Sequence, residues 1–161
     1  MENIFNQATI DIIIRLSLAL FLGMIIGTER AWAHKTAGMR TYALVSMGAA
    51  LFIIISEMIS LQYLSVGGFD PTRIPSQIIV GIGFIGTGLI FARESKLMGL
   101  TTATSLWVSA GIGIACGFRF FDIAIIATFL ILFIFIVLWF AEEQLKKTKY
   151  FKEKPPSDNI N

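Results

Sequence analysis

The sequence has few of the residues that enzymes use for nucleophilic or metal chemistry. It contains one cysteine and one histidine in 161 residues. A lone cysteine, Cys116, excludes an intrachain disulfide, and with His34 as its only companion it does not make a Cys/His metal site. A Ser/His/Asp triad would need that same histidine, and the sequence has no G-x-S-x-G motif. We therefore expect a protein that is not an enzyme and that holds no metal and no cofactor.

Charged residues are also scarce, and apolar residues are in excess. Charged residues make up 15% of the chain, against about 25% in soluble domains. Hydrophobic residues make up 55% even before the 14 glycines are added, and the mean hydropathy is +0.75. A signal peptide is not expected, because the N-terminus carries Glu2 and the first apolar run contains Asp11 and Arg15. This composition places the chain in a lipid bilayer.

Five apolar stretches are long enough to cross a bilayer. A helix needs about 20 apolar residues for this, with about 17–25 acceptable. The third and fourth stretches are short, so we expect other parts of the protein to surround them. The sequence predicts an all-α membrane protein, a bundle of five transmembrane helices. They cover about residues 10–27, 41–60, 76–92, 101–117 and 121–140.

The distribution of lysine and arginine predicts an orientation. Ten of these residues lie in the tail and in the connections after the first and third stretches, while the opposite side carries only Arg73 and Arg119. The positive-inside rule then places the N-terminus outside and the C-terminus in the cytoplasm. We expect a short external N-terminus over residues 1–9, a five-span domain over 10–141, and a basic, partly disordered cytoplasmic tail over 142–161.

Residues 81–88 read GIGFIGTG and match the dinucleotide fingerprint G-x-G-x-x-G. The fingerprint also needs a preceding strand and an acidic residue about 20 positions later. Here the glycines lie within an uncharged apolar stretch, and no carboxylate follows at that distance. Gly81 and Gly88 share a helix face with Gln77, and Gly83 and Gly86 lie near the opposite face. A helix thin on both sides is expected at the centre of the bundle; tight packing, a solute path and a docking groove are alternative roles.

Small residues at four-residue spacing predict close helix contacts elsewhere, because they let membrane helices approach closely. The stretch over 121–140 lacks such residues, is bulky, and should face lipid. The ladders are Ala19, Gly23 and Gly27; Ser46 and Ala50; and Thr101, Ser105, Ser109, Gly113 and Gly117.

Charges near the outer side of the membrane form a second pattern. Asp11 and Arg15 are four residues apart, so they can pair along one helix face. A charge inside a membrane segment is a functional hypothesis by default. The pair either neutralises itself or forms a polar vestibule together with Asp70 and Arg73. Alternatively, Asp70 or Ser76 caps a helix start and Arg73 pairs locally. Glu57, near the outer end of the second stretch, is a candidate to balance Arg73.

On the cytoplasmic side, charged residues flank the ends of the apolar stretches. Glu29 and Arg30 follow the first small-residue ladder, and Arg40 opens the second stretch. These residues either anchor at lipid headgroups or, in the case of Glu29 and Arg40, form a cluster with Thr101.

Four separated motifs resemble the MgtC/SapB family of membrane proteins. They are Gly27-Thr28-Glu29-Arg30; Ala37-Gly38-Met39-Arg40-Thr41; Asp70-Pro71-Thr72-Arg73-Ile74 with Gln77 and GIGFIGTG; and Gly99-Leu100-Thr101-Thr102-Ala103 through Trp107.

The resemblance covers about residues 10–120 and implies an inner-membrane protein of about five spans. It also implies a role in bacterial adaptation to low magnesium, with a link to virulence in pathogens. Thr101 stands where some members have asparagine, Thr28 where the motif is usually hydrophobic, and Ala31 where an acid often follows. Longer members carry an ACT-like C-terminal domain, so we expect a short member without it.

Two functions remain open at this point. The first is non-enzymatic modulation of another membrane complex; the second is a small transporter or channel with a path along 76–92. No acidic residue lies at mid-membrane, which argues against a dedicated Mg²⁺ path. Expected partners are the lipid bilayer and either another membrane protein or a second copy, not nucleic acid. The candidate residues are Glu29, Arg30, Gly38, Arg40, Asp70, Arg73, Gln77, Gly81, Gly83, Gly86, Gly88, Gly99, Thr101, Thr102 and Trp107, with Asp11 and Arg15 as an intramembrane pair.

Overall fold

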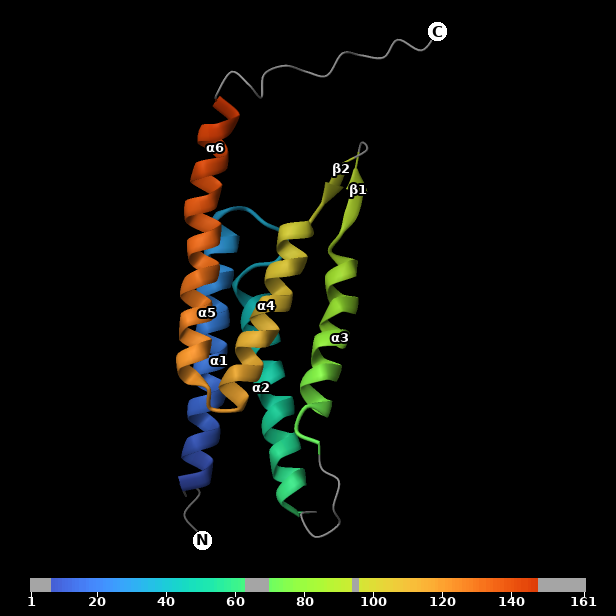
Figure 1. The fold of residues 1–161 in the computed structure, drawn as a ribbon, viewed down its shortest axis with the longest axis vertical. Helices are drawn as coiled ribbons and strands as arrows, with labels where there is room; N and C mark the ends of the chain where they lie inside the picture. Colours follow the sequence, from blue (N-terminus) through green and yellow to red (C-terminus); the bar gives the residue numbers. More distant parts are fainter. Residues whose placement is uncertain (1–6, 63–69, 94–95, 148–161) are drawn as a thin grey trace.

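The computed structural model describes residues 7–62, 70–93 and 96–147 (Figure 1). Most of the predicted N-terminal segment and of the predicted tail lies outside these residues. The described chain consists mainly of helices, with one two-stranded antiparallel hairpin between the third and fourth helices. The elements are α1 (Gln7–Trp32), α2 (Met39–Gln62), α3 (Arg73–Gly88), β1 (Phe91–Arg93), β2 (Lys96–Met98), α4 (Leu100–Gly117), α5 (Phe121–Phe133), a π-helical segment (Ile134–Leu138) and α6 (Trp139–Lys147).

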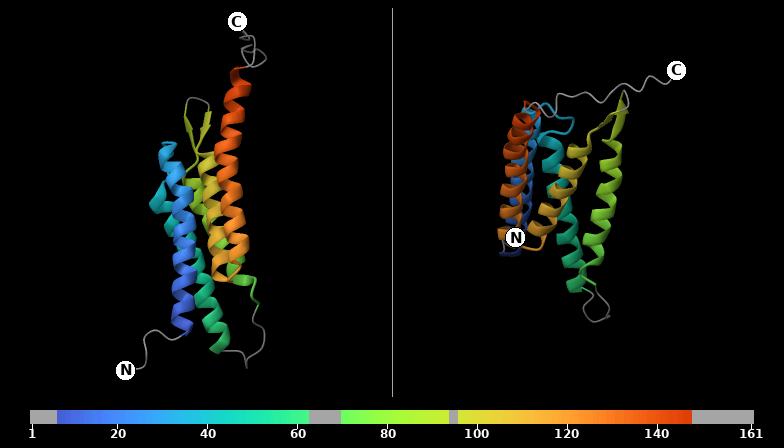
Figure 2. Two further views of the ribbon diagram at one scale, coloured as in Figure 1. Left: turned by 90° about the vertical axis from the view of Figure 1, so that its left-hand side faces the viewer. Right: turned by 45° about the horizontal axis from the view of Figure 1, so that its top comes forward.

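The helices alternate in direction along the long axis of the molecule. The start of α1, the end of α2, the start of α3 and the α4–α5 turn lie at one end, which we call the Arg119 end (Figure 1). The α1–α2 connection, the β1–β2 hairpin and α6 lie toward the other end, the hairpin end. Figure 2 shows α5, the π-helical segment and α6 as one continuous rod.

Within the described residues, four helical stretches are long and apolar enough to cross a membrane: 7–32, 39–61, 100–117 and 121–145. They support a multi-pass membrane protein. The third helix has 16 residues, so at about 1.5 Å per residue it is shorter than the roughly 30 Å core of a bilayer. The fifth span is therefore not confirmed.

The third helix is offset from the predicted span of about 76–92 at both ends. The helix begins at Arg73 and ends at Gly88, and residues 91–93 already form a strand. The last turn tightens, since the Leu89 and Ile90 amides donate to carbonyls three residues earlier. Gly99, with φ of +85°, then lies against the Leu89 carbonyl and closes the hairpin. The apolar stretch continues past the end of the helix because Phe91 and Ala92 of β1 are also apolar.

The centre of the bundle is α4 rather than α3, so the expected central position of the glycine-rich helix is wrong. Helix α4 contacts α1, α2, α3 and α5. Helix α3 lies at the edge of the bundle (Figure 2), where Ile82 and Gly86 are its buried residues. A Cβ atom built on Gly81, Gly83 or Gly88 would meet nothing within 4 Å. These glycines therefore do not mark a close contact between helices. The sequence alone does not distinguish them from glycines at which two helices pack closely.

The closest helix approaches involve glycines of α1 and α4. A Cβ on Gly23 would lie 2.5 Å from the Tyr42 carbonyl oxygen of α2. A Cβ on Gly113 would lie 2.0 Å from the Ser46 carbonyl oxygen. Helices α1, α2 and α4 are therefore packed backbone against backbone, and even an alanine would force them apart at these two positions.

The rod from α5 to α6 covers the bundle with one thin buried face. Ala124, Thr128, Ile131 and Phe135 form that face, and the Thr128 hydroxyl donates to the Ala124 carbonyl at 2.8 Å. Most of its other side chains are large, apolar and exposed, which is the surface that lipid would contact.

Candidate functional site

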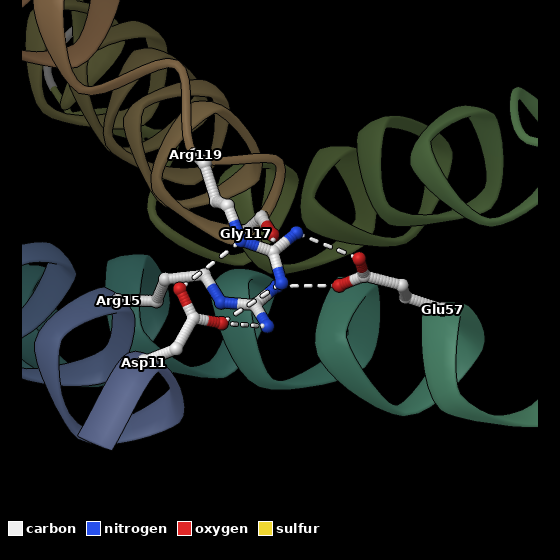
Figure 3. A network of polar contacts seen from close by, with 5 residues as sticks. All are labelled: Asp11, Arg15, Glu57, Gly117 and Arg119. Carbon is white, nitrogen blue, oxygen red and sulfur yellow. Dashed lines mark hydrogen bonds and ion pairs between the residues drawn. The ribbon is translucent and has the colours of Figure 1, made fainter. Parts of the chain in front are cut away.

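An ion-pair network joins three elements at the Arg119 end (Figure 3). The Arg15 side chain lies 2.5 Å from Asp11 and 2.5 Å from Glu57, and it donates to the Gly117 carbonyl at 2.9 Å. Arg119 donates to both carboxylate oxygens of Asp11, at 3.0 and 2.9 Å, and to Glu57 at 2.7 Å. Two cations and two anions thus close a neutral ring that ties α1, α2 and the α4–α5 turn together.

The two arginines of this network differ in their surroundings. The Arg15 side chain is 4% exposed, and its Nε has no hydrogen-bond partner. Arg119 is 46% exposed and adopts φ of +63°. The hydrogen bonds that Arg119 donates to Asp11 and Glu57 raise the pKa of Arg119 above its ordinary value.

The structure confirms the predicted Asp11–Arg15 pair. It does not join that pair to Asp70 and Arg73. Glu57 bonds Arg15 and Arg119 instead of balancing Arg73. The role of Arg119 was not predicted from the sequence. The available signal was Glu57, an acid near the outer end of the second apolar stretch that needs a cation as its partner.

A large groove lies between α2 and α3. Its volume is about 1250 Å³, and apolar side chains form most of its wall. The polar residues Asp70, Arg73 and Gln77 line the part near the start of α3, and Gly81 lines it further along. The groove gathers four sequence-predicted residues in one place.

Asp70 forms a turn directly before α3. Its Oδ1 accepts hydrogen bonds from the Thr72 amide at 2.8 Å and the Thr72 hydroxyl at 2.7 Å. These bonds lower the pKa of Asp70 below its ordinary value, and the Arg73 charge adds to the effect. The Ser76 hydroxyl donates to the Arg73 carbonyl, whereas the Arg73 guanidinium is left exposed at the groove.

At the hairpin end, Arg30 is buried instead of reaching lipid headgroups. It pairs with both carboxylate oxygens of Glu29, and its guanidinium carbon lies 3.4 Å from the centroid of the Phe135 ring. Because Glu29 is engaged by Arg30 while Arg40 and Thr101 are exposed, the described residues do not form the predicted Glu29–Arg40–Thr101 cluster. Phe135, which sequence reasoning did not single out, belongs to the π-helical segment.

The polar face of α4 is packed against α2. The buried Tyr42 hydroxyl bonds the Ser105 hydroxyl and reaches the Thr102 carbonyl at 3.4 Å. The Ser109 hydroxyl donates to the Tyr42 carbonyl at 3.2 Å. These hydroxyls therefore form hydrogen bonds that hold α2 and α4 together in the interior. Tyr42 was missed by the sequence reasoning, although a tyrosine inside an apolar stretch needs a hydrogen-bond partner.

The remaining candidate residues lie outside the ion-pair network and do not line the groove. Gly38 leaves room for Ala31, whose Cβ would lie 3.5 Å from an added Cβ, and Gly86 faces Ala103 at 3.7 Å. Trp107 is half exposed on α4. In the ranges that the structure describes, no three His, Cys, Asp or Glu residues group closely enough to hold a metal ion.

Comparison with known proteins gives a family match over most of the chain. The MgtC family model matches residues 16–144. The chain is 42% identical over 137 residues to the "Putative magnesium transporter YhiD" of Escherichia coli (strain K12), which covers 82% of this chain and 64% of that protein. It is 43% identical over 135 residues to "Protein MgtC" of Salmonella typhimurium (strain LT2), which covers 84% of this chain and 55% of that protein.

The chain thus spans about half to two thirds of the length of these curated relatives. No solved structure matches it.

Proposed function

Because this chain belongs to the MgtC family, we propose that it is a non-enzymatic protein of the bacterial inner membrane that modulates another membrane complex. The setting is adaptation to low magnesium or a related stress, with a role in virulence in pathogens. In this proposal the Arg119 end faces outward and the hairpin end faces the cytoplasm. The protein contacts lipid and one protein partner, and it binds no nucleic acid.

The tight packing between α2 and α4 is the observation that carries this proposal, because it leaves no polar path between the two helices. A transporter would use the hydroxyl-bearing face of α4 as part of a polar path. That face is filled, since Ser105 and Ser109 bond Tyr42 and the Gly113 Cβ position falls 2.0 Å from a backbone carbonyl. A path along α3 remains the second candidate function, supported by the open groove beside Gly81 and by the name of the Escherichia coli relative.

The outward side of α3, away from α2 and α4, is the surface we assign to the protein partner. Gly83 lies there with open space around it. The neighbouring Ser76 and Thr87 hydroxyls donate to carbonyls of their own helix. This side therefore carries small side chains whose hydrogen-bond donors already have partners. Such a face favours close contact with another membrane helix.

Replacing glycine by leucine at Gly83 tests this assignment. Gly83→Leu should keep the thermal stability of the purified protein but lose cross-linking to its partner from a photoreactive residue at Val80. It should also lose support of growth at low magnesium in a strain lacking the gene. Gly111→Leu is the matched control, because Gly111 also has nothing within 4 Å. Equal partner cross-linking in both variants would contradict the assignment.

A flux assay distinguishes the two candidate functions. The purified protein in liposomes should transport neither Mg²⁺ nor monovalent cations. Measured flux that Gly81→Leu abolishes would overturn the modulator proposal in favour of a transport path along α3.

A further inference from the structure

The α2–α3 groove has the shape and polarity of a site for an amphiphile. Its volume of about 1250 Å³ exceeds the roughly 300–1,000 Å³ of pockets for drug-sized ligands. Phe52, Ile55 and Ile59 of α2 face Ile74, Ile78 and Ile85 of α3 across it. An occupant that matches this wall is long and apolar along most of its length.

The charges of the groove lie at one end. Asp70 precedes α3 and Arg73 is its first residue, so both lie at the Arg119 end, where the chain emerges from the apolar region. The guanidinium of Arg73 is exposed and makes no ion pair with the described residues, although its charge acts on Asp70. The mouth therefore presents one cation and one anion side by side.

The start of α3 adds to the positive potential at this mouth. The helix has no side-chain cap on its first turn, and the amino end of a helix dipole favours anions such as phosphate. The Arg73 and Ser76 amides already donate to the Asp70 and Thr72 carbonyls, so the contribution of this end is mainly its potential. The hydrogen bonds from Thr72 lower the pKa of Asp70, so its carboxylate stays charged at neutral pH. A headgroup with a primary ammonium beside its phosphate complements both residues, because its N–H groups can donate hydrogen bonds to the Asp70 carboxylate. A quaternary ammonium has no such donor, and a headgroup with phosphate alone leaves Asp70 unmatched.

We propose that the α2–α3 groove binds one phospholipid with a zwitterionic, amine-bearing headgroup of the phosphatidylethanolamine type. Arg73 and the start of α3 bind the phosphate, Asp70 binds the ammonium, and an acyl chain lies along Gly81 between the two helices. This site uses the side of α3 that faces α2, so it does not rest on the proposed docking of a protein at Gly83.

Spin-labelled lipids test the proposal on the full-length protein. Phosphatidylethanolamine and phosphatidylglycerol, each labelled on the acyl chain, are added in turn to the protein in nanodiscs of unlabelled phosphatidylcholine. Electron paramagnetic resonance then measures the immobilised fraction. Wild-type protein should immobilise about one phosphatidylethanolamine per chain and retain it in preference to phosphatidylglycerol. Equal immobilisation of the two lipids, or of neither, would overturn the proposal.

Variants locate the lipid. Arg73→Gln should weaken retention by about tenfold, the loss expected for a charge-assisted hydrogen bond. Asp70→Asn should abolish the preference for phosphatidylethanolamine. Gly81→Leu should exclude the acyl chain without loss of stability, because a Cβ there meets nothing within 4 Å.

Matched controls keep the lipid test decisive. Arg40→Gln removes an exposed arginine at the opposite end, and Gly83→Leu adds the same bulk on the other side of α3; both should retain the lipid. Retention unchanged in Arg73→Gln and Gly81→Leu would refute the site. Cross-linking between two copies through a cysteine at position 81 would also refute it, because a second copy would then occupy the groove.

Discussion

Among the described residues, Arg15 is a buried charge with partners on three sides. A charge within a membrane segment is costly unless it is paired, and this one is buried with partners on three sides. Asp11 lies on its own helix, Glu57 on α2, and the Gly117 carbonyl at the end of α4. One side chain therefore holds the ends of three helices together, which makes it structural in the first instance.

Removing Arg15 should destabilise the protein far more than removing Arg119. Arg15→Met leaves Asp11 and Glu57 with one cation between them, and breaking a buried pair typically costs about 3–5 kcal/mol. Arg119 is 46% exposed, so Arg119→Met should cost about 1 kcal/mol or less. Unfolding of the purified variants in mixed detergent micelles measures both. Equal losses would show that the buried and exposed pairs contribute alike.

Only the local half of this network is predictable from the sequence. Asp11 and Arg15 lie four apart on one helix, and that spacing alone predicts their contact. Arg119 lies 108 residues from Asp11 and 62 from Glu57. Their contact depends on which helices are neighbours, and hydropathy carries no such information. The same holds for Arg30 and Phe135, which meet only because the π-helical segment lies beside the end of α1.

At the scale of elements, α3 differs from the other helices in length and in surroundings. Its apolar character was predictable, but its end was not, because the chain stays apolar into the hairpin while its hydrogen bonding changes. A short helix at the edge of a bundle is also matched poorly to the bilayer thickness, and such a mismatch is accommodated by local thinning of the bilayer or by snorkelling of flanking side chains. Local thinning of the bilayer is expected to bring lipid headgroups close to the start of α3.

Gly99 should be the least replaceable glycine of the hairpin end. Its φ of +85° disfavours any residue with a Cβ, and that atom would lie 2.1 Å from the Leu89 carbonyl oxygen. Gly99→Ala should therefore cost at least about 1–3 kcal/mol and make the hairpin sensitive to protease. Gly48→Ala is the control, since nothing lies within 4 Å of it and alanine favours a helix by about 1 kcal/mol. A hairpin as protease-resistant in Gly99→Ala as in the control would contradict this role.

At the scale of the whole molecule, the helical architecture follows from the sequence more readily than the packing order does. Long apolar stretches separated by polar turns predict alternating helices directly. Which helix occupies the centre depends on which small residues meet a neighbour. The small residues of α4 do so at Ser109 and Gly113, whereas most glycines of α3 do not. The amino-acid composition does not distinguish the small residues of α4 from the glycines of α3.

The charge asymmetry between the two ends predicts the orientation in the membrane. Lysine and arginine gather on the side of the α1–α2 connection, the hairpin and the tail, so that side should remain in the cytoplasm. Cysteines at Thr36 and Asp122 sample exposed positions on opposite sides, in a background with Cys116→Ala. Membrane-impermeant maleimide should label position 122 in intact cells and position 36 only after permeabilisation. The reverse labelling pattern would show the opposite orientation, in which the Asp70–Arg73 mouth lies at the inner leaflet.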